Sequence, residues 1–597
     1  MAAQDKAAQA GAADIEFTDQ QQKYIDAPLD KHVYLRACPG SGKTEVVAAK
    51  VCKIIQEWNH HPSGIALLTF LNSATDELQS RVHKYLREPM GLPHYISTFD
   101  SFVLTHLLSS IASEITGFQG RDGDFRIRII DKSADIYRTR IKICGRSVSA
   151  CRYNYDKGSK RYVFSTNDRK WDNEANLAQQ DEADQKALLT NKKRLWAAGF
   201  ATYGDIDILA LVGMQEEKFK DYFSRIVRRF PLVIVDECQD LSAEQLLIVK
   251  RLSLLGVKFH FVGDLNQSIY GFRRSNPASV RRRMEELGFE EYVLNENWRS
   301  GQAVVDVCSN ILQSDRVVGN PRIASVKPRV IEYQNCPSEV LPAIREMSLI
   351  HDKVVVVARG HTTLQRLRTG RAFEGIELLA LACINLKAGR LTDIAQCLET
   401  FGKWLAARLK LQVTKAGPYC PMDIESKLAW RIFLHDGLQF LVEHGAGDGN
   451  QTWSDWARAA KITLGKLPDQ TFVPVEVREH LEGLRGLNLR ARSGQGKMLI
   501  SERLTGVPDV AAKRDCLRFE TIHGVKGETH DVTVVVSSQK PGVHQSHWKD
   551  WLRDRTSEAA RFAYVASSRP KHVLIWAVKK LKAEDRLVLE GLGFELP

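Results

Sequence analysis

The most constraining feature of this 597-residue sequence is a glycine-rich segment, ACPGSGKT, that joins an apolar run to a helical pattern. The run VYLRA at 33–37 is typical of a buried strand, and Glu45–Trp58 has the periodicity of a helix. Two glycines let the backbone curl so that its amides face phosphate groups, while Lys43 reaches the β/γ-phosphates and Thr44 ligates Mg²⁺. The sequence therefore predicts a loop that binds ATP and Mg²⁺ and consists of Ala37, Cys38, Pro39, Gly40, Ser41, Gly42, Lys43 and Thr44.

A second apolar run, Leu232–Val235, ends in the acids Asp236 and Glu237. Beside such a phosphate-binding loop, an acid at the tip of a neighbouring strand holds Mg²⁺ through its water shell. Asp236 is placed for that task, so Thr44 and Asp236 are the predicted metal ligands, and Glu237 would orient and deprotonate the attacking water. An acidic pair alone is more often structural, but ACPGSGKT about 190 residues upstream favours catalysis.

Short apolar runs that alternate with helical patterns predict an α/β fold. Strands buried on both faces are typical of parallel sheets. The runs form two sets, at 33–37, 65–70, 232–236 and 259–263, and at 328–333, 353–358, 531–537 and 573–577. We therefore expect two α/β cores, each with an inserted subdomain, because the connections 103–195 and 366–514 are too long for loops.

The charge distribution indicates what kind of partner the chain can bind. The formal net charge is +12, which favours polyanions or anionic surfaces. Residues 126–170 hold thirteen Lys and Arg against four Asp, interleaved with Tyr137, Tyr153, Tyr155, Tyr162 and Phe164. Such a stretch suits a phosphate backbone with stacked bases, and it suits the solvated face of a β-hairpin equally well.

Eleven cysteines without a CxxC or CxxH pair exclude the usual zinc and iron–sulfur spacings and fit a reducing compartment. No segment reaches the roughly 20 apolar residues that span a bilayer, and the first residues lack the apolar core of a signal peptide. We therefore expect a cytoplasmic protein with no membrane partner and a disordered N-terminus at residues 1–14.

Eight further segments follow one another in a family-specific order. They are FTDQQQ (17–22), LLTFLNSA (67–74), STFDS (97–101), VDECQD (235–240), VGDLNQSIYGFR (262–273), LNENWRS (294–300), TIHGVKGETHDV (521–532) and FAYVASSRPK (562–571). With ACPGSGKT, this series resembles the Q motif and motifs I to VI of superfamily 1A DNA helicases of the UvrD/Rep type. The resemblance covers both expected cores and neither insertion.

The resemblance implies two RecA-like P-loop NTPase cores, 1A and 2A, with inserted subdomains 1B and 2B. Core 1A would comprise residues 15–102 and 196–290, and core 2A residues 291–365 and 515–597. Subdomain 1B would be the basic insertion 103–195, and 2B the mostly helical insertion 366–514.

Residues outside the phosphate-binding loop would then also serve ATP hydrolysis. Gln21 would read the adenine edge, and Trp298 would stack on adenine where the family usually has tyrosine. Gln267 would sense the γ-phosphate and link hydrolysis to the DNA track. Arg299 and Arg569 would reach the γ-phosphate from the second core and stabilise transition-state charge.

The implied DNA-binding residues come from both cores. They are Phe70 and Asn72 of motif Ia, Thr98 and Phe99 of motif Ib, Tyr270 and Phe272 of motif III, and His523 and Lys526 of motif V. The two motif III aromatics would stack on bases, with a place in the core as the alternative for each.

The sequence departs from the family pattern at several positions. Glu45 stands where relatives usually carry arginine, Asp100 where histidine is common, and Ser567–Ser568 where threonine precedes the arginine. Glu528 directly follows Gly527, which leaves its expected ribose contact open. None of these departures removes a catalytic group.

The family resemblance implies an ATP-dependent DNA helicase or translocase of 3′→5′ polarity that acts on single strands and single/double-strand junctions. The segments KGETHDV and YVASSRPK, with about 26 residues after Lys571 and no appended nuclease, resemble helicase-like proteins of bacterial anti-phage operons. The helicase subunit of the Gabija system, which works beside a separate nuclease encoded nearby, is the leading suggestion. The alternatives are an ATP- and DNA-responsive regulatory subunit that activates a partner nuclease with little unwinding, and a DNA repair or recombination helicase.

Overall fold

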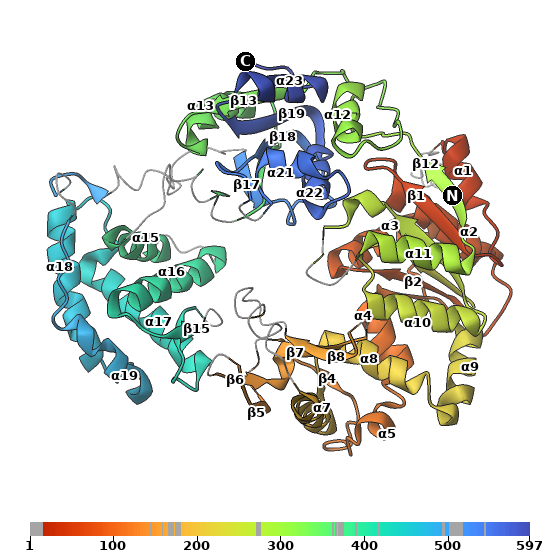
Figure 1. The fold of residues 1–597 in the computed structure, drawn as a ribbon, viewed down its shortest axis with the longest axis horizontal. Helices are drawn as coiled ribbons and strands as arrows, with labels where there is room; N and C mark the ends of the chain where they lie inside the picture. The colour runs from red at the N-terminus through yellow and green to blue at the C-terminus, as the bar shows by residue number, and fades with distance from the viewer. Residues whose placement is uncertain are drawn as a thin grey trace, which may run out of the picture.

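Four units surround a common centre in the computed structural model, two built on sheets and two inserted between their strands (Figure 1). The structure describes residues 16–597 except 133, 135, 144–145, 158, 165–171, 173–180, 270, 272–275, 361–362, 365–366, 368–374, 388–390, 415–417, 492–495, 501–516 and 543–544. The predicted α/β class with parallel sheets is confirmed.

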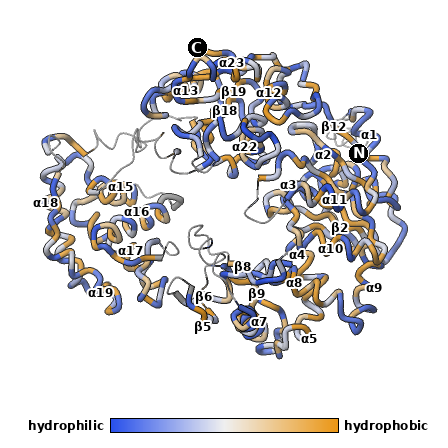
Figure 2. The backbone as a smooth tube through the Cα atoms, in the orientation of Figure 1, coloured by the Kyte–Doolittle hydropathy of each residue, from blue (hydrophilic) through white to orange (hydrophobic). Residues whose placement is uncertain are grey.

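The first sheet has six strands, all paired in parallel, in the order β12-β1-β11-β10-β2-β3. The strands are β1 Val33–Ala37, β2 Ile65–Thr69, β3 Tyr95–Thr98, β10 Leu232–Val235, β11 Lys258–Gly263 and β12 Glu290–Leu294. Every residue of β2 and β10 is buried, and Figure 2 shows hydrophobic residues along the strands around β2. The carboxyl ends of β1, β10 and β11 share one edge, which is where ligands bind in parallel α/β sheets.

Helices cover both faces of this sheet. One face packs against α1 Asp19–Ile25, α2 Lys43–Glu57 and α3 Asn72–Leu86, and the other against α4 Phe99–Phe102, α10 Ala243–Leu254 and α11 Pro277–Leu287. Apolar side chains on both faces of each strand explain why the strands read as continuous apolar runs.

The first sheet extends past residue 290, where the sequence placed the boundary between cores 1A and 2A. Strand β12 pairs in parallel with β1 from Glu290 to Leu294, so this sheet ends four residues later than predicted. The reason is that β12 fills the free edge beside β1 before the chain crosses to the second sheet. The other domain boundaries stay predictions.

The second sheet has five parallel strands in the order β13-β19-β18-β14-β17. The strands are β13 Arg329–Tyr333, β14 Val354–Ala358, β17 Leu517–Thr521, β18 His530–Val536 and β19 Pro570–Lys579. Helices α12 Gln302–Leu312 and α22 Glu558–Ser567 cover one face, and α13 Leu341–Ser348 covers the other. Because α22 leads almost directly into β19, Arg569 lies at the junction of helix and strand.

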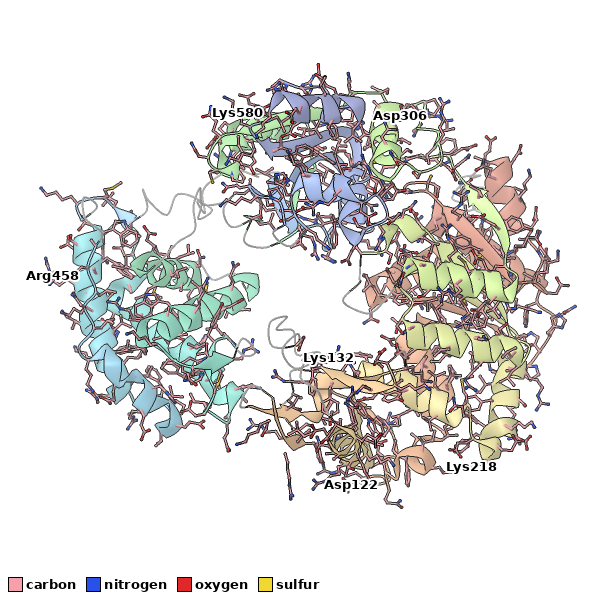
Figure 3. The ribbon with its side chains drawn as sticks, in the orientation of Figure 1. Asp122, Lys132, Lys218, Asp306, Arg458 and Lys580 are labelled. Carbon is pink, nitrogen blue, oxygen red and sulfur yellow. The ribbon has the colours of Figure 1, made fainter. Side chains whose placement is uncertain are left out.

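The unit between β3 and β10 contains helices and two antiparallel hairpins. Its main elements are α7 Glu182–Ala197, α8 Tyr203–Gly213, the hairpin β5 Arg138–Ile143 with β6 Arg146–Ser149, and the hairpin β7 Tyr153–Asp156 with β8 Arg161–Phe164. Figure 3 shows Lys132 at the edge of this unit nearer the centre of the molecule and Asp122 at the outer edge.

The aromatic residues of the basic stretch mostly face inward. Tyr153, Tyr162 and Phe164 are 0%, 7% and 3% exposed and pack in the core of this unit. Arg140 and Lys142 are exposed. Side chains alternate between the two faces of a hairpin, which explains most of the alternation of basic and aromatic residues, as the alternative of a solvated hairpin face predicts. These three rings therefore do not form a row of aromatics that could stack on bases.

The unit between β14 and β17 is helical. Its helices include α15 Ile376–Lys387, α16 Leu391–Leu409, α17 Lys427–Leu441, α18 Trp453–Lys466 and α19 Val475–Leu481. Trp430, Trp453 and Trp456 are at most 2% exposed and form part of a core of its own. Within the ranges that the structure describes, no helix combines the length and the apolar character needed to cross a membrane.

Candidate active site

A cleft of about 1580 Å³ lies between the edges of the two sheets. Its walls come from both sides, so groups far apart in the sequence meet there. Of the predicted site residues, it gathers Gln21, Ala37, Cys38, Pro39, Gly40, Ser41, Gly42, Lys43, Thr44, Phe70, Asp236, Glu237, Gln267, Trp298, Arg299, His523, Lys526 and Arg569. Asn72, Thr98 and Phe99 do not line it.

The glycine-rich loop after β1 needs its glycines for two reasons. Gly40 and Gly42 have φ angles of 74° and 78°, in the left-handed region that favours glycine. A Cβ atom at Gly40 would lie 2.6 Å from Cβ of Arg299, so a side chain there would collide with motif IV. Gly42 directly precedes α2, whose N-terminal amides form an anion site at the cleft.

Lys43, the first residue of α2, lies among the acids that follow β10. Its Nζ is 2.9 Å from Oδ1 of Asp236, and it also pairs with Glu237. Burial works to lower the pKa of Lys43, but the two carboxylates outweigh it and raise this pKa above its usual value. Burial works to raise the pKa of Glu237, but the charges of Lys43 and Lys526 lower it to about 2. Glu237 is therefore ionised, as a general base must be.

The backbone at Glu237 is turned sharply. Its φ of 55° lies in the left-handed region, which is uncommon for a residue with a side chain. The Glu237 amide donates to Oδ1 of Asp236 at 2.8 Å, and the Gln239 side chain donates to the Glu237 carboxylate. These bonds stabilise a conformation in which both carboxylates reach the cleft at the end of one short strand.

Gln267 connects the two sheets through its side-chain amide. It lies in η5 Leu265–Gln267, the turn after β11, where its Nε2 donates to Asp264 at 3.0 Å. Its Oε1 accepts a hydrogen bond from Nη2 of Arg569 at 3.1 Å. Asp264 also accepts from the hydroxyl of Tyr564 in α22 at 3.0 Å. The γ-phosphate sensor expected at Gln267 thus contacts the second unit directly.

Arg299 and Arg569 place two guanidinium groups at the same wall of the cleft. Nη1 of Arg299 donates to the carbonyl of Ser568 at 2.9 Å, and Nε of Arg569 donates to the carbonyl of Val565 at 2.8 Å. Burial and the nearby charge of Arg569 lower the pKa of Arg299 to about 9. Among the residues that the structure describes, neither arginine forms an ion pair with a carboxylate, so this wall favours an incoming anion.

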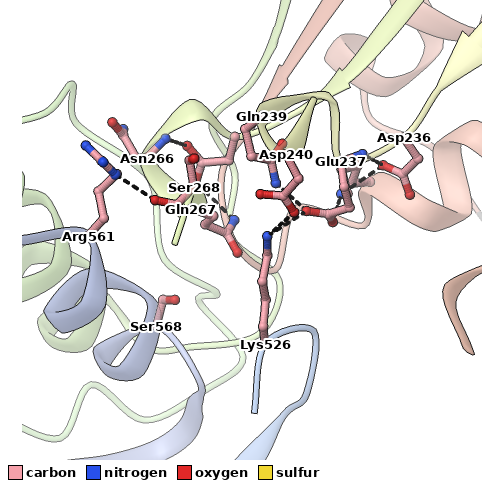
Figure 4. Close-up of polar contacts among 12 residues, drawn as sticks. Asp236, Glu237, Gln239, Asp240, Asn266, Gln267, Ser268, Lys526, Arg561 and Ser568 are labelled. Carbon is pink, nitrogen blue, oxygen red and sulfur yellow. Dashed lines mark hydrogen bonds and ion pairs between the residues drawn. The ribbon is translucent and has the colours of Figure 1, made fainter. Parts of the chain in front are cut away.

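Lys526 is placed differently from the DNA contact that the sequence implied. It points from the turn after β17 toward the acids of the first unit (Figure 4). Its Nζ is 2.5 Å from Oδ2 of Asp240 and 3.7 Å from Oε2 of Glu237. Its side chain is 7% exposed. Because Asp240 is buried and acidic, it holds this ammonium group inside the cleft and away from the surface.

The remaining residues that were implied to contact DNA differ in their surroundings. Phe70 is half-buried at the cleft and Asn72 is exposed at the start of α3, whereas Thr98 caps α4 through the Ser101 amide at 3.2 Å. Phe99 is 2% exposed in the core beneath the first sheet, so its ring packs inside and is no surface for a base. His523 contacts the carbonyl of Ile269 at 3.0 Å. Tyr270 and Phe272 lie outside the described residues.

Gln21 and Trp298, the two residues expected to contact the nucleoside, both line the cleft. Oε1 of Gln21 accepts from the Thr18 amide at 3.0 Å, and its Nε2 donates to the carbonyl of Ser41 at 3.0 Å. Gln21 therefore holds α1 against the phosphate-binding loop. Trp298 is 41% exposed and lines the cleft, so an indole face is open to a planar ligand.

Two departures from the family pattern have partners of their own. Glu45 pairs with Arg81 of α3 and accepts from the Tyr85 hydroxyl at 2.7 Å. Glu528 lines the cleft but accepts from Nη2 of Arg518 at 2.8 Å and contacts Nε2 of His530 at 3.1 Å. Sequence reasoning missed Arg81 and Arg518, which lie outside the quoted segments, and gave no role to Asp264, which lies within VGDLNQSIYGFR.

The donor set fits Mg²⁺ held in the usual way of nucleotide sites. The Thr44 hydroxyl and the Asp236 carboxylate are oxygen donors that line the cleft beside the phosphate-binding loop. No cluster of three or more His, Cys, Asp or Glu that could hold a metal occurs in the described part of the chain. A few protein oxygens completed by phosphate and water oxygens suit Mg²⁺.

Comparison with known proteins agrees with this geometry. Residues 17–286 match the model of the UvrD/REP helicase N-terminal domain. The chain is 23% identical to the ATP-dependent DNA helicase srs2 of Schizosaccharomyces pombe over 54% of this chain and 38% of that protein. It is 26% identical to DNA helicase II of Haemophilus influenzae over 51% of this chain and 41% of that protein. It is 25% identical to the ATP-dependent DNA helicase PcrA of Leuconostoc citreum over 47% of this chain and 36% of that protein.

These matches span about two fifths of the length of the curated relatives. Residues 17–286 are thus similar to the N-terminal domain of UvrD/REP helicases, in keeping with the resemblance that the motifs indicate.

Proposed function

We propose that this protein is an ATP-dependent DNA helicase or translocase with 3′→5′ polarity. The observation that carries the proposal is the hydrogen bond of 3.1 Å between Arg569 of the second unit and Gln267 of the first. It brings an arginine into the cleft that contains Lys43 and Glu237. A site that needs both units to be complete suits a reaction coupled to their relative movement.

The chain's own residues would divide the work of hydrolysis. Lys43 and the amides at the start of α2 would bind the β- and γ-phosphates, while Thr44 and Asp236 would hold Mg²⁺, which neutralises phosphate charge when bound. Glu237 would orient the attacking water and take its proton. Arg299 and Arg569 would stabilise the charge that develops on the γ-phosphoryl oxygens.

Coupling to DNA would pass through the segment after β11. Gln267 contacts Arg569, and the same segment continues to Tyr270 and Phe272, the two aromatics proposed to stack on bases. Phe70, Asn72 and Thr98 would contact the strand from the first unit. Release of phosphate would thus change the contact between Gln267 and Arg569, and with it the position of the segment proposed to bind DNA.

The test is the ATPase activity of the purified chain with and without single-stranded DNA. We expect DNA to stimulate hydrolysis, and we expect Lys43→Ala and Glu237→Gln each to abolish it. Normal hydrolysis in either variant would reject the assignment of the site. A strand-displacement assay on duplexes with a 3′ or a 5′ tail then tests unwinding and polarity.

An anti-phage role beside a nuclease encoded nearby, as in the Gabija system, is a more specific proposal. It is supported by the resemblance of KGETHDV and YVASSRPK to segments of helicase-like proteins in bacterial anti-phage operons. Strong unwinding by this chain alone would reject the alternative of a regulatory subunit with little unwinding. Co-purification with a neighbouring nuclease would favour the anti-phage role over DNA repair or recombination.

A further inference from the structure

The ion pair between Lys526 and Asp240 joins the two sheet units inside the cleft. Lys526 comes from the turn after β17 of the second sheet, and Asp240 ends η4 Cys238–Asp240, the turn after β10 of the first. The Lys526 side chain is 7% exposed and that of Asp240 is 2% exposed. A buried ion pair of this kind depends on both partners, because removal of one leaves the other charge without compensation.

We propose that Lys526 and Asp240 form a lock that holds the two units together over the catalytic acids, with Lys526 as a positioning residue for Glu237. The proposal rests on the proposed ATP hydrolysis and adds a role for two residues outside the hydrolytic set. Asp240 anchors the ammonium group at 2.5 Å, and the same group lies 3.7 Å from Glu237.

The balance of charge in the cleft supports this role. Three acids, Asp236, Glu237 and Asp240, lie near two lysines, Lys43 and Lys526. When Lys43 turns to bind phosphate, Lys526 stays as the lysine in contact with the acids. It then keeps Glu237 and Asp240 together, although two like charges with little water around them would otherwise repel each other.

Two further contacts across the same junction are hydrogen bonds without a basic–acidic pair, which makes the lock chemically distinct from them. Arg561 of α22 donates to the carbonyl of Ser268 at 2.7 Å, and Tyr564 donates to Asp264 (Figure 4 shows the first). These bonds hold the segment after β11. The Lys526–Asp240 pair instead holds the turn after β10, which carries Glu237. Loss of the lock should therefore affect the general base first.

A DNA contact by Lys526, the role implied by motif V, makes the opposite prediction. A lysine that binds a phosphate of DNA must be accessible, and its loss weakens DNA binding in a salt-dependent manner. Lys526 would have to leave Asp240 and Glu237 to do so. The two roles differ in whether hydrolysis or DNA affinity changes.

The experiment compares Lys526→Met, Lys526→Arg, Asp240→Asn and the double variant Lys526→Met/Asp240→Asn. We expect Lys526→Met to lower kcat about tenfold or more at saturating ATP and DNA, with the Kd for single-stranded DNA and its salt dependence unchanged. Lys526→Arg should restore most of kcat. The double variant should be no slower than Lys526→Met, since the two residues act as one pair.

Lys580→Met is the matched control, because Lys580 is an exposed lysine on the same unit (Figure 3). A Kd for DNA that weakens in Lys526→Met while kcat stays at the wild-type value would overturn the lock. Losses in the two single variants that multiply in the double variant would overturn it as well. Absence of ATPase activity in the wild-type chain would instead reject the proposed function, so the two failures can be told apart.

Discussion

Replacement of Gln267 by methionine should uncouple Arg569 from the first unit. Methionine has a similar length but cannot accept the hydrogen bond of 3.1 Å from Nη2 of Arg569 or donate the one of 3.0 Å to Asp264. Asp264 keeps the Asn266 amide and the Tyr564 hydroxyl as donors, so the buried carboxylate stays compensated. The change therefore removes mainly the orientation of one guanidinium group.

The magnitude follows from the kind of bond that is lost. A hydrogen bond to a charged group contributes about 1.5–3 kcal/mol. If that energy orients Arg569 for the transition state, its loss lowers kcat by roughly 10- to 150-fold, since each 1.36 kcal/mol is a factor of ten. Because the lost bond orients Arg569 for the transition state, the KM for ATP should change much less than kcat.

The assay is steady-state ATP hydrolysis at saturating single-stranded DNA, with Asn266→Met as the control. Asn266 lies in the same turn, its side chain is exposed, and its backbone bond to Asp264 survives the change. The reasoning is refuted if Gln267→Met keeps a kcat within about twofold of the control, a difference worth only about 0.4 kcal/mol.

Three further predictions concern buried charges outside the hydrolytic set. Lys192 is 0% exposed, and its Nζ lies 2.7 Å from Oδ1 of Asp205. Lys192→Met should therefore destabilise the unit between β3 and β10 by about 3–5 kcal/mol in urea unfolding. The further change Asp205→Asn should recover part of this loss. Burial raises the pKa of Asp207, whose Oδ1 has no hydrogen-bond partner in the described structure, so the folded state keeps a proton that the unfolded state loses. Stability from this group is lost as pH rises above the unfolded pKa, and Asp207→Asn should therefore raise the thermal midpoint more at pH 8 than at pH 5. Lys50 donates to three carbonyls at the end of α1, at 3.0, 3.3 and 2.8 Å. Lys50→Met should therefore loosen α1 and raise the KM for ATP in steady-state assays. An unchanged KM would contradict this role.

The sequence allowed prediction of those parts of the site that are continuous with a strand and a helix. ACPGSGKT follows β1 and leads into α2, and the acids follow β10, so their placement at one sheet edge could be expected from the parallel α/β pattern. The predicted fold class followed from the same alternation of apolar runs and helical patterns. At these points, residues that are neighbours in the sequence are also neighbours in the structure.

The sequence could not show which way a side chain turns once its strand has ended. Lys526 and Phe99 both follow strands of four or five residues, and both belong to motifs associated with DNA. In the structure, Lys526 pairs with Asp240 and Phe99 is buried beneath the first sheet. A buried acid without a partner is costly, and so is an aromatic ring left in water. Both contacts are made with segments that are distant in the sequence.

The position of β12 has the same cause. Its burial pattern, with three of five residues partly or fully buried, is compatible with the edge of either sheet, and only pairing with β1 decides between them. The chain thus leaves the first sheet beside the phosphate-binding loop and reaches Trp298 and Arg299 within a few residues. Motif IV is tied to the loop directly, as the bond of 2.8 Å from the Trp298 amide to the Gly40 carbonyl shows.

These contacts bear on whether the chain acts as a motor or as a switch. The junction between the sheet units consists largely of groups that nucleotide would engage, such as Glu237, Gln267 and Arg569. Binding of ATP must then change the stability of the junction. If ATP changes the affinity of the protein for a ligand that contacts both units, that ligand changes the affinity for ATP by the same factor. DNA and a partner protein can each meet that requirement. The feature that separates a motor from a switch is therefore directional release of DNA, and the measurement that detects it is strand displacement from one tail only.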